Sequence, residues 1–239
     1  MFSVDHLNRI RLEELEYVFP YLPEKGRVLE IGAGTGMQAL ALSERGFDVS
    51  AIDIAASTYS GHRQFPVQDY DGITIPFADA TFDVVYSSNT LEHVKDLSRM
   101  HAEIARVLKP GGRSIHLMPT HGWRAWTTLS GPVSAVQSAL TGRFGQAAKT
   151  LGATALLMPH GERGNAIGEL RLFRPAWWER NFREHGFTVI ERHPVPLFYT
   201  GWMVLGRRLG FARRAALSRI LGSASYLYVA RRSVDSGRP

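Results

Sequence analysis

The sequence contains no cysteine among its 239 residues, which excludes a disulfide framework, thiolate-bound zinc and a cysteine nucleophile. It also lacks an apolar run of the ~18 residues that a membrane-spanning helix requires. The first residues alternate charged and apolar side chains, which is not the pattern of a secretory signal. Because 44% of the residues are hydrophobic, the chain can form a packed core. We therefore expect a folded, cytoplasmic protein.

Acidic residues are scarce at one end of the chain. From Trp202 to Pro239, eight arginines are accompanied by a single acid, Asp235, so this segment has a formal charge of +7. The other 201 residues hold 20 basic and 21 acidic side chains and are close to neutral. A nucleic acid, an anionic membrane surface, an acidic substrate or a solvated helix face would each account for this distribution.

Strands and helices alternate through much of the sequence. Short apolar runs predict strands, and amphipathic periods with proline or glycine at their ends predict the helices between them. The predicted strands are residues 27–31, 47–54, 65–68, 82–87, 113–118, 187–193 and 224–231, and the predicted helices are residues 5–20, 35–45, 95–108 and 175–185. Strands that are apolar along most of their length indicate an α/β protein with a parallel sheet covered on both faces.

A glycine-rich turn follows the first predicted strand. Gly32, Gly34 and Gly36 allow the backbone to turn tightly and a ligand to approach it closely, and Asp53 ends the next predicted strand. A site for a dinucleotide pyrophosphate would have the spacing G-x-G-x-x-G, whereas this sequence reads G-x-G-x-G and has Met37 where that pattern requires glycine. The spacing therefore disfavours a dinucleotide.

Several segments of the first half together resemble one family. With Glu30 before the turn, residues 28–36 are similar to the first motif of class I S-adenosylmethionine-dependent methyltransferases, of the type 11-like kind. Residues 71–77 with 82–85, residues 89–94 and residues 106–112 resemble later segments of that family, in the same order. The resemblance covers about residues 26–118. It implies a Rossmann-like, doubly wound, seven-stranded sheet with an antiparallel last strand. After strand five the alternation breaks over residues 119–173, which are too long for a plain connection and form a functional insertion or a cover over a site.

The resemblance implies S-adenosyl-L-methionine as the cofactor. Asp53 would accept hydrogen bonds from the ribose hydroxyls, and Asp71 would contact the adenine amino group, with the Gly72 amide beside the ring. Asp69 is an alternative to Asp71. The residues expected to bind the cofactor are Glu30, Gly32, Ala33, Gly34, Gly36, Asp53, Ile54, Asp71, Gly72 and Asn89.

Methyl transfer from a sulfonium is an in-line displacement, and an oxygen acceptor also requires a base that removes its proton. Candidates lie beyond strands four and five, where open α/β sheets bind ligands. The catalytic candidates are His121, His93 and Glu92. Three others, His116, Glu162 and His160, are weaker, and His116 alternates with apolar neighbours like a core histidine.

The insertion contributes two further candidates but no metal site. Trp123 and Trp126 line an acceptor pocket or form the core of the insertion itself. The histidines are scattered, with no H-x-x-x-H spacing and no clustered carboxylates, so we predict no metal ligands.

The basic segment 202–221 has the period of a helix. Trp202, Leu205, Leu209 and Ile220 fall on one stripe, and Arg214 lies opposite it. Such a helix packs on the sheet or lies at a membrane surface with its arginines among the headgroups. Because the arginines are not interleaved with stacking aromatics, we do not expect a nucleic-acid partner.

These observations predict a single domain over residues 1–239. It comprises an N-terminal helix in 1–25, a cofactor-binding half in 26–118, an insertion in 119–173 that covers the substrate, and C-terminal helices and strands in 174–239. The predicted reaction is methyl transfer to an oxygen of a small molecule, a sugar or a lipid-linked glycan. A non-catalytic S-adenosylmethionine-binding protein and a nicotinamide-dependent oxidoreductase are the alternatives. The sequence predicts neither the acceptor nor the oligomeric state.

Overall fold

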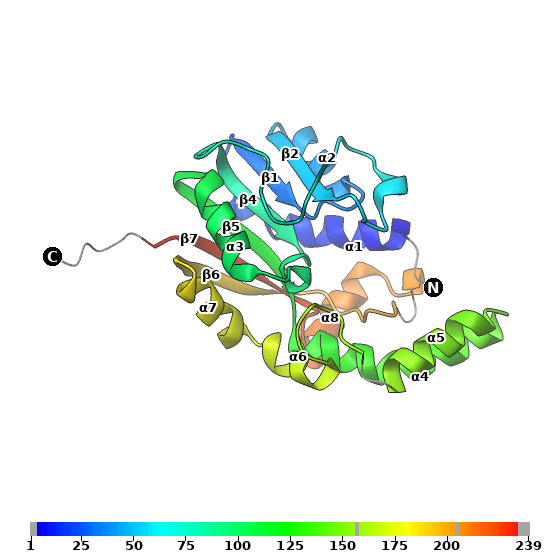
Figure 1. The fold of residues 1–239 in the computed structure, drawn as a ribbon. Helices are drawn as coiled ribbons and strands as arrows, with labels where there is room; N and C mark the ends of the chain where they lie inside the picture. Colours follow the sequence, from blue (N-terminus) through cyan, green and yellow to red (C-terminus); the bar gives the residue numbers. More distant parts are fainter. Residues whose placement is uncertain (1–3, 156–157, 204–205, 234–239) are drawn as a thin grey trace. The chain divides into compact units, whose positions relative to one another are not determined.

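A seven-stranded sheet forms the centre of the fold in a computed structural model, which describes residues 4–155, 158–203 and 206–233 (Figure 1). The strand order is β3-β2-β1-β4-β5-β7-β6, with helices on both sides and the last strands antiparallel. The strands are β1 Arg27–Ile31, β2 Asp48–Ile54, β3 Gln68–Tyr70, β4 Phe82–Ser88, β5 Leu108–Pro119, β6 Phe187–Val195 and β7 Ser225–Arg232. The predicted α/β sheet, including its antiparallel end, is confirmed.

Helices connect most of the strands. The α-helices are α1 Val4–Glu16, α2 Met37–Glu44, α3 Leu97–Val107, α4 His121–Leu140, α5 Phe144–Ala155, α6 Ala166–Leu172, α7 Pro175–Glu184 and α8 Phe211–Leu221. Short 3-10 turns are η1 Phe19–Tyr21, η2 Ser60–His62, η3 Leu91–His93 and η4 Gly206–Arg208. The insertion predicted after the fifth strand is confirmed, because α4, α5 and α6 follow β5 before the chain returns to the sheet.

The register of the sheet brings four strand ends to one edge. β1 pairs in parallel with β2 and β4, so Ile31 lies opposite both Ile52 and Ser87. β3 extends the same edge, with Tyr70 opposite Ile54. Ligands of open α/β sheets bind beyond the carboxyl ends of parallel strands. We therefore expect a ligand site in the loops that leave this edge.

Histidines in the core are held by neutral polar partners. The Nε2 atom of His101 on α3 lies 3.0 Å from Oδ1 of Asn181 on α7. His116 on β5 is fully buried, with Nδ1 2.7 Å from the Ser87 hydroxyl and Nε2 against the Ser114 hydroxyl. Burial lowers the pKa of His116 to about 3, with a smaller contribution from His101. His116 is therefore a neutral core residue, as its alternation with apolar neighbours indicates.

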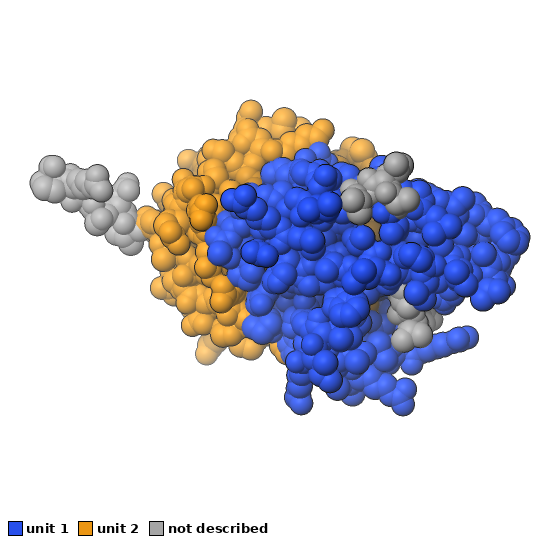
Figure 2. All heavy atoms as spheres, turned by 90° about the horizontal axis from the view of Figure 1, so that it is seen from below, with its two compact units in different colours: residues 1–7, 119–177, 194–226 blue, residues 8–118, 178–193, 227–239 orange. Residues whose placement is uncertain are grey.

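The chain forms two compact units (Figure 2). Unit 1 comprises residues 1–7, 119–177 and 194–226, and unit 2 comprises residues 8–118, 178–193 and 227–239. Unit 1 contains eleven basic and three acidic side chains, a net charge of +8, whereas unit 2 contains 17 basic and 19 acidic side chains, a net charge of −2. The excess positive charge of the protein therefore belongs to unit 1 as a whole and not to the C-terminal segment alone.

The insertion is helical although its sequence shows no single period. α4 and α5 pack on each other through small side chains: a Cβ on Gly131 would overlap the side chain of Thr154, and Ala135 and Ala147 are buried. A guanidinium–carboxylate pair joins α4 to α6, with Nε of Arg124 2.6 Å from Oε2 of the fully buried Glu169. Because small residues make the helix contacts, the usual stripe of large buried side chains is missing.

Two strand boundaries differ from the prediction. The third strand is β3 Gln68–Tyr70 and not residues 65–68, because Phe65 and Val67 pack against a cluster of buried alanines. The fifth strand begins at Leu108, which pairs with Phe82 ahead of an irregularity in the register. In both places, packing by apolar side chains decides which residues pair.

The predicted helix over residues 202–221 is wrong in its extent and in its faces. Only α8, Phe211–Leu221, is α-helical within the described residues of this segment, and residues 204–205 lie outside the described part. Arg214, expected on the solvent side, is 1% exposed, whereas Ile220, expected in the packed stripe, is 82% exposed. The guanidinium of Arg214 donates to the carbonyl oxygens of Leu209, Phe198 and Gly206. An unbroken helix would pair the carbonyl oxygens of Gly206 and Leu209 with backbone amides. In the structure, the guanidinium of Arg214 donates to them instead.

We expect Arg214→Ala to lower the free energy of unfolding by about 2–4 kcal/mol, because it leaves buried carbonyl oxygens without a donor. The exposed neighbour supplies the control, since Arg213→Ala should change stability by less than about 0.5 kcal/mol. Urea unfolding of both variants measures the difference. Equal midpoints for the two variants would show that the Arg214 contacts do not stabilise unit 1.

Candidate active site

The turn between β1 and α2 depends on left-handed backbone at three glycines. Gly32, Gly34 and Gly36 have φ angles of 72°, 55° and 71°. A Cβ on Gly32 would overlap the side chain of Thr90, and a Cβ on Gly36 would lie 2.8 Å from Cβ of Phe65. Only glycine combines these φ angles with this lack of space, so the spacing of the motif is a requirement of the turn.

Asp53 fixes the turn from the end of β2. Its Oδ2 accepts a hydrogen bond of 3.0 Å from the Gly34 amide, and its Oδ1 lies 2.8 Å from the amide of Ile54. The side chain is 9% exposed, so the carboxylate can meet a ligand over only a small area. This carboxylate is suited to accept hydrogen bonds from hydroxyl groups.

Glu30 lies beneath the turn at the end of β1. It is 1% exposed, its Oε2 is buried without a hydrogen-bond partner, and a backbone contact from Ala39 reaches the carboxyl. Burial, with a smaller contribution from the nearby charge of Asp53, raises the pKa of Glu30 to about 8. A buried acid with an unsatisfied oxygen is a favourable partner for a cationic group of a ligand.

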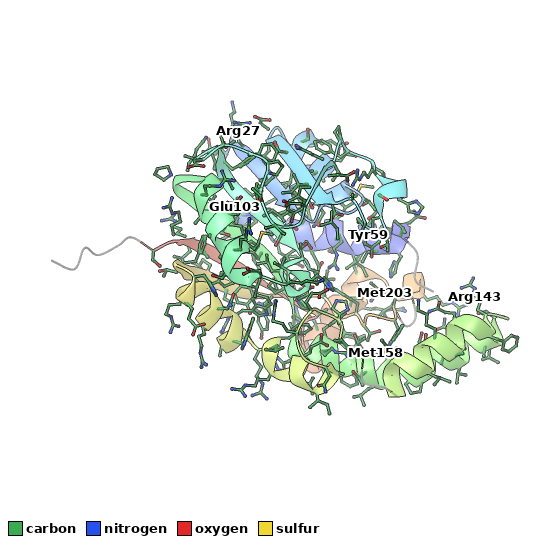
Figure 3. All side chains as sticks on the ribbon, in the orientation of Figure 1. Arg27, Tyr59, Glu103, Arg143, Met158 and Met203 are labelled. Carbon is green, nitrogen blue, oxygen red and sulfur yellow. The ribbon has the colours of Figure 1, made fainter. Side chains whose placement is uncertain are left out.

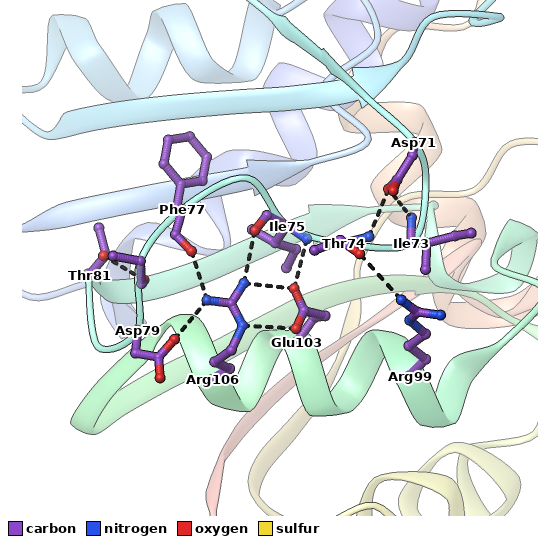
Figure 4. A network of polar contacts seen from close by, with 11 residues as sticks. Asp71, Ile73, Thr74, Ile75, Phe77, Asp79, Thr81, Arg99, Glu103 and Arg106 are labelled. Atoms are coloured by element: carbon purple, nitrogen blue, oxygen red, sulfur yellow. Dashed lines mark hydrogen bonds and ion pairs between the residues drawn. The ribbon is translucent and has the colours of Figure 1, made fainter.

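Asp71 and Gly72 follow β3 at the same edge (Figure 4). Oδ1 of Asp71 accepts hydrogen bonds from the amides of Ile73 and Thr74, at 2.8 and 2.7 Å. These two amides lower the pKa of Asp71, so the exposed side chain is a carboxylate. Gly72 has a φ of 76°, and a Cβ there would lie 3.1 Å from Cγ2 of Ile54, which borders the same position.

An ion pair on α3 holds the segment that follows Asp71 (Figure 4). The guanidinium of Arg106 donates to the carbonyl oxygens of Ile75 and Phe77, at 2.8 and 2.7 Å, and to both carboxylate oxygens of Glu103. Glu103 in turn accepts from the Ile75 amide at 2.8 Å. This contact with Arg106 lowers the pKa of Glu103. The alternative acid Asp69 is engaged elsewhere, in an ion pair with Arg63.

The segment after β4 contributes Asn89, Glu92 and His93. Asn89 has a left-handed φ of 50°, and its amide donates to the Leu117 carbonyl at 2.8 Å, which ties the segment to β5. Thr90 packs against Gly32, so the segment contacts the glycine turn directly. In η3, Glu92 is 2% exposed and its Oε1 lies 3.9 Å from Nε2 of the half-exposed His93.

The remaining candidates lie in unit 1. His121 begins α4, and its amide donates to the Phe173 carbonyl at 3.2 Å. Partial burial lowers the pKa of His121, and the charge of Arg174 adds to this effect. Glu162 is exposed, and the ring centroid of His160 lies 4.7 Å from that of Trp123.

The two tryptophans of α4, Trp123 and Trp126, pack against other residues of unit 1. Trp123 is 6% exposed and packs against His160. Trp126 donates from Nε1 to the Leu221 carbonyl at 2.9 Å and packs edge-on against Phe198. Of the two interpretations for these residues, the structure favours the core of the insertion.

Three residues near the turn were not among the predicted site residues. Tyr59 lies 3.4 Å from the position of a Cβ on Gly34, and Asn8 of α1 accepts from the Thr35 hydroxyl at 2.9 Å. Burial raises the pKa of Tyr70 to about 12, so its hydroxyl stays protonated beside Asp53. Tyr70 is the last residue of β3, and the predicted strand over residues 65–68 ended before it. Asn8 and Tyr59 have no local pattern that would indicate the contact.

The side chains at this edge fit S-adenosylmethionine better than a dinucleotide. The turn leaves no room for Cβ atoms, and the groups around it are carboxyls: Glu30, Asp53 and Asp71. A pyrophosphate would meet two negative charges here, whereas an amino group and ribose hydroxyls would meet acceptors.

The comparison with known families agrees with this geometry. Residues 29–116, which include the glycine turn, Asp53, Asp71 and the segment after β4, match the family model of a methyltransferase domain. Residues 29–116 are therefore similar to the methyltransferase domain of the class I S-adenosylmethionine-dependent enzymes, and the cofactor of this class is S-adenosylmethionine.

Named relatives share this part of the chain. Over 102 residues the chain is 37% identical to the biotin biosynthesis bifunctional protein BioHC of Cellvibrio japonicus. This match covers 39% of this chain and 20% of that protein. Over 94 residues it is 39% identical to a demethylmenaquinone methyltransferase of Corynebacterium kroppenstedtii, covering 38% and 41% of the two chains. The chain thus spans less than half the length of these curated relatives.

The similarity of the fold to solved structures extends beyond residues 29–116, which match the family model. A solved S-adenosylmethionine-dependent methyltransferase of Mesorhizobium loti has a TM-score of 0.58 with 16% identity, over 92% of this chain and 98% of that one. Among the described residues, none of the helices could span a bilayer.

We expect Asp53→Asn to weaken the binding of S-adenosylhomocysteine at least about tenfold, because a charged acceptor for the ligand hydroxyls is lost. Gly34→Asp should abolish binding, since its side chain meets the Tyr59 ring in a left-handed conformation. Asp48→Asn, at the exposed start of the same strand, is the control and should bind like the unmodified protein. Isothermal titration measures all three, and unchanged affinity in Asp53→Asn and Gly34→Asp would place the ligand elsewhere.

Stability should depend on pH through Glu30. The unfolded chain releases the Glu30 proton near pH 4.5, whereas the folded protein retains it to about pH 8. The free energy of unfolding should therefore fall as the pH rises through this window, by up to about 1.4 kcal/mol per pH unit. Glu30→Gln should remove this dependence, and the exposed control Glu24→Gln should retain it. Urea unfolding across the window provides the measurement, and identical pH profiles for the two variants would contradict the assignment.

Proposed function

We propose that this protein transfers the methyl group of S-adenosylmethionine to an oxygen atom of a small molecule, a sugar or a lipid-linked glycan. The observation that supports methyl transfer most directly is the set of carboxyls around the glycine turn, Glu30, Asp53 and Asp71. The named relatives include a methyltransferase, which is similar to 38% of the chain. The choice of an oxygen acceptor rests on His93 and on the buried carboxyl of Glu92 beside it.

Each residue at the sheet edge would contact a different part of the cofactor. Asp53 accepts from ribose hydroxyls, Asp71 accepts from the adenine amino group, and Glu30 is the partner of the amino acid group. The amides and glycines of residues 32–36 and 72 allow close contact without Cβ atoms in the way. When bound, S-adenosylmethionine supplies an electrophilic methyl group on a sulfonium, so the protein itself needs no covalent intermediate.

The base candidates act on the acceptor. A hydroxyl oxygen that gains a methyl group must lose its proton, and an imidazole accepts that proton near neutral pH. His93 is half-exposed and follows β4, and the carboxyl of Glu92 at 3.9 Å stabilises the imidazolium that forms. Glu92 is thus a positioning residue. His121, at the start of α4, is the second candidate base, and its lowered pKa keeps the ring neutral and able to accept a proton.

The acceptor class can be identified without assuming a substrate. The protein is incubated with methyl-labelled S-adenosylmethionine and a cell extract, and the products are separated into lipid, glycan, protein, RNA and small molecules. Label in the lipid, glycan or small-molecule fraction, absent with Asp53→Asn, is the expected result. Label in protein or RNA would contradict the proposed acceptor. Binding of S-adenosylhomocysteine without any transfer would indicate a non-catalytic binding protein, and a melting shift with NAD(P) instead would indicate an oxidoreductase.

With the labelled acceptor in hand, His93→Gln should lower kcat by about 10²–10⁴-fold while the affinity for S-adenosylhomocysteine stays unchanged. Glu92→Gln should move the acidic limb of the pH–rate profile to lower pH, because it removes the carboxyl that stabilises the imidazolium, and the base acts in its neutral form. His121→Gln serves as the comparison. If only His121→Gln reduces kcat, the base belongs to unit 1, and if neither variant does, the acceptor needs no histidine base.

A further inference from the structure

The helical pair α4–α5 presents large apolar side chains to solvent. On α4, the side chains of Leu129, Val133, Val136 and Leu140 recur at intervals of four and three residues, so they share one face. They are 57–83% exposed, and Phe144 at the start of α5 is 71% exposed. An exposed apolar stripe of this kind, in a segment with regular secondary structure, indicates a contact surface.

The opposite face of α4, which packs against α5, has small residues in place of large apolar ones. Gly131 and Ala135 face inward on α4, and Ala147 and Thr150 are the buried residues of α5. Helix pairs surrounded by water turn their large apolar side chains inward. Small residues at the helix contact, with leucine and valine outside, are typical of helices whose surroundings are apolar. The hairpin is thus built for an apolar environment on its outer face.

The charges of the hairpin identify that environment. Between residues 121 and 161 the sequence has three basic residues and no aspartate or glutamate. Arg124 pairs with Glu169 inside unit 1, whereas Arg143 and Lys149 are exposed. Figure 1 shows α4 and α5 side by side, and Figure 3 places Arg143 at the turn between them. A second copy of this surface would bring like charges together, whereas anionic lipid headgroups would complement them.

We propose that the α4–α5 hairpin docks on the surface of an anionic lipid bilayer. The stripe of α4 and Phe144 enter the boundary between headgroups and acyl chains, and Arg143 and Lys149 contact the lipid phosphates. This surface differs from residues 202–221, for which membrane contact was one of two interpretations of the sequence. The inference does not depend on methyl transfer, because it rests on unit 1 alone.

The absence of cysteine allows the surface to be probed at single positions. Phe144→Cys and Ile220→Cys are each labelled with a polarity-sensitive dye, and vesicles of phosphatidylcholine with about 30 mol% phosphatidylserine are added. Ile220 on α8 is a matched control, because it is 82% exposed and Leu140 is 83% exposed. We expect a blue shift and increased emission at position 144 and no change at position 220. A response at position 220 alone would overturn the hairpin assignment and point to α8.

Vesicle sedimentation of the full chain separates the apolar and the electrostatic contributions. Leu140→Ser with Phe144→Ser should lower partitioning at least about tenfold. Arg143→Gln and Lys149→Gln should each lower it about fivefold on anionic vesicles. All of these side chains are exposed, so the variants should retain the unfolding midpoint of the parent protein.

Three results would overturn the docking surface. The first is partitioning that is equal for the parent and the Leu140→Ser, Phe144→Ser variant, or no partitioning at all. The second is self-association in solution that this variant abolishes, measured by light scattering, which would assign the stripe to a second copy of the chain. Loss of partitioning with Ile220→Ser and not with the hairpin variant would also contradict the proposal.

Discussion

The left-handed turn between β1 and α2 is the constraint on which the rest of the site depends. All three glycines have left-handed φ angles, and at Gly32 and Gly36 the space that a Cβ would occupy is also filled, by Thr90 and Phe65 from segments far apart in the sequence. The turn can close only when β1, β2 and β4 are in register, since Asp53 must reach the Gly34 amide. Sheet pairing and the site are therefore formed together.

Carboxyl groups give the site its selectivity. Glu30 is neutral at moderate pH because it is buried, whereas Asp71 is ionised because backbone amides surround its exposed carboxylate. Two acids at one edge of the sheet thus have different charge states, and the largest causes of the difference are the burial of Glu30 and the hydrogen bonds to Asp71. Such a site favours a ligand with an amino group and hydroxyls over one with phosphates, which is consistent with the family whose model residues 29–116 match.

Charge and apolar surface are distributed unequally between the two units. Unit 2, which contains the glycine turn, is nearly neutral, and unit 1 has a net charge of +8. Unit 1 also contains the outward-facing stripe of α4 and the buried pair of Arg124 and Glu169. The proposed cofactor binding and the proposed surface attachment would thus depend on different properties: directional hydrogen bonds in unit 2, and apolar area with long-range charge in unit 1.

The sequence by itself determined the alternation of strands and helices, the turn and the acid at the end of the second strand. These features are local: strand apolarity, glycine spacing and proline positions act within a few residues. It also identified His116 as a core residue, because alternation along a strand is a local pattern. In α4 the apolar period from Leu129 to Leu140 lies on the exposed face, so it did not indicate the contacts with α5, which small residues make.

Only the tertiary structure decided where Arg214 and Ile220 lie. An isolated helix would turn the arginine to solvent, yet three carbonyl oxygens brought together by the fold bind its guanidinium and bury it. The charge state of Glu30 and the contact of Thr90 with Gly32 are likewise long-range, because burial and steric overlap depend on residues distant in sequence. Local periodicity can therefore be predicted from neighbouring residues in the sequence. The desolvation of a side chain and its contacts with residues distant in the sequence arise only when the chain folds.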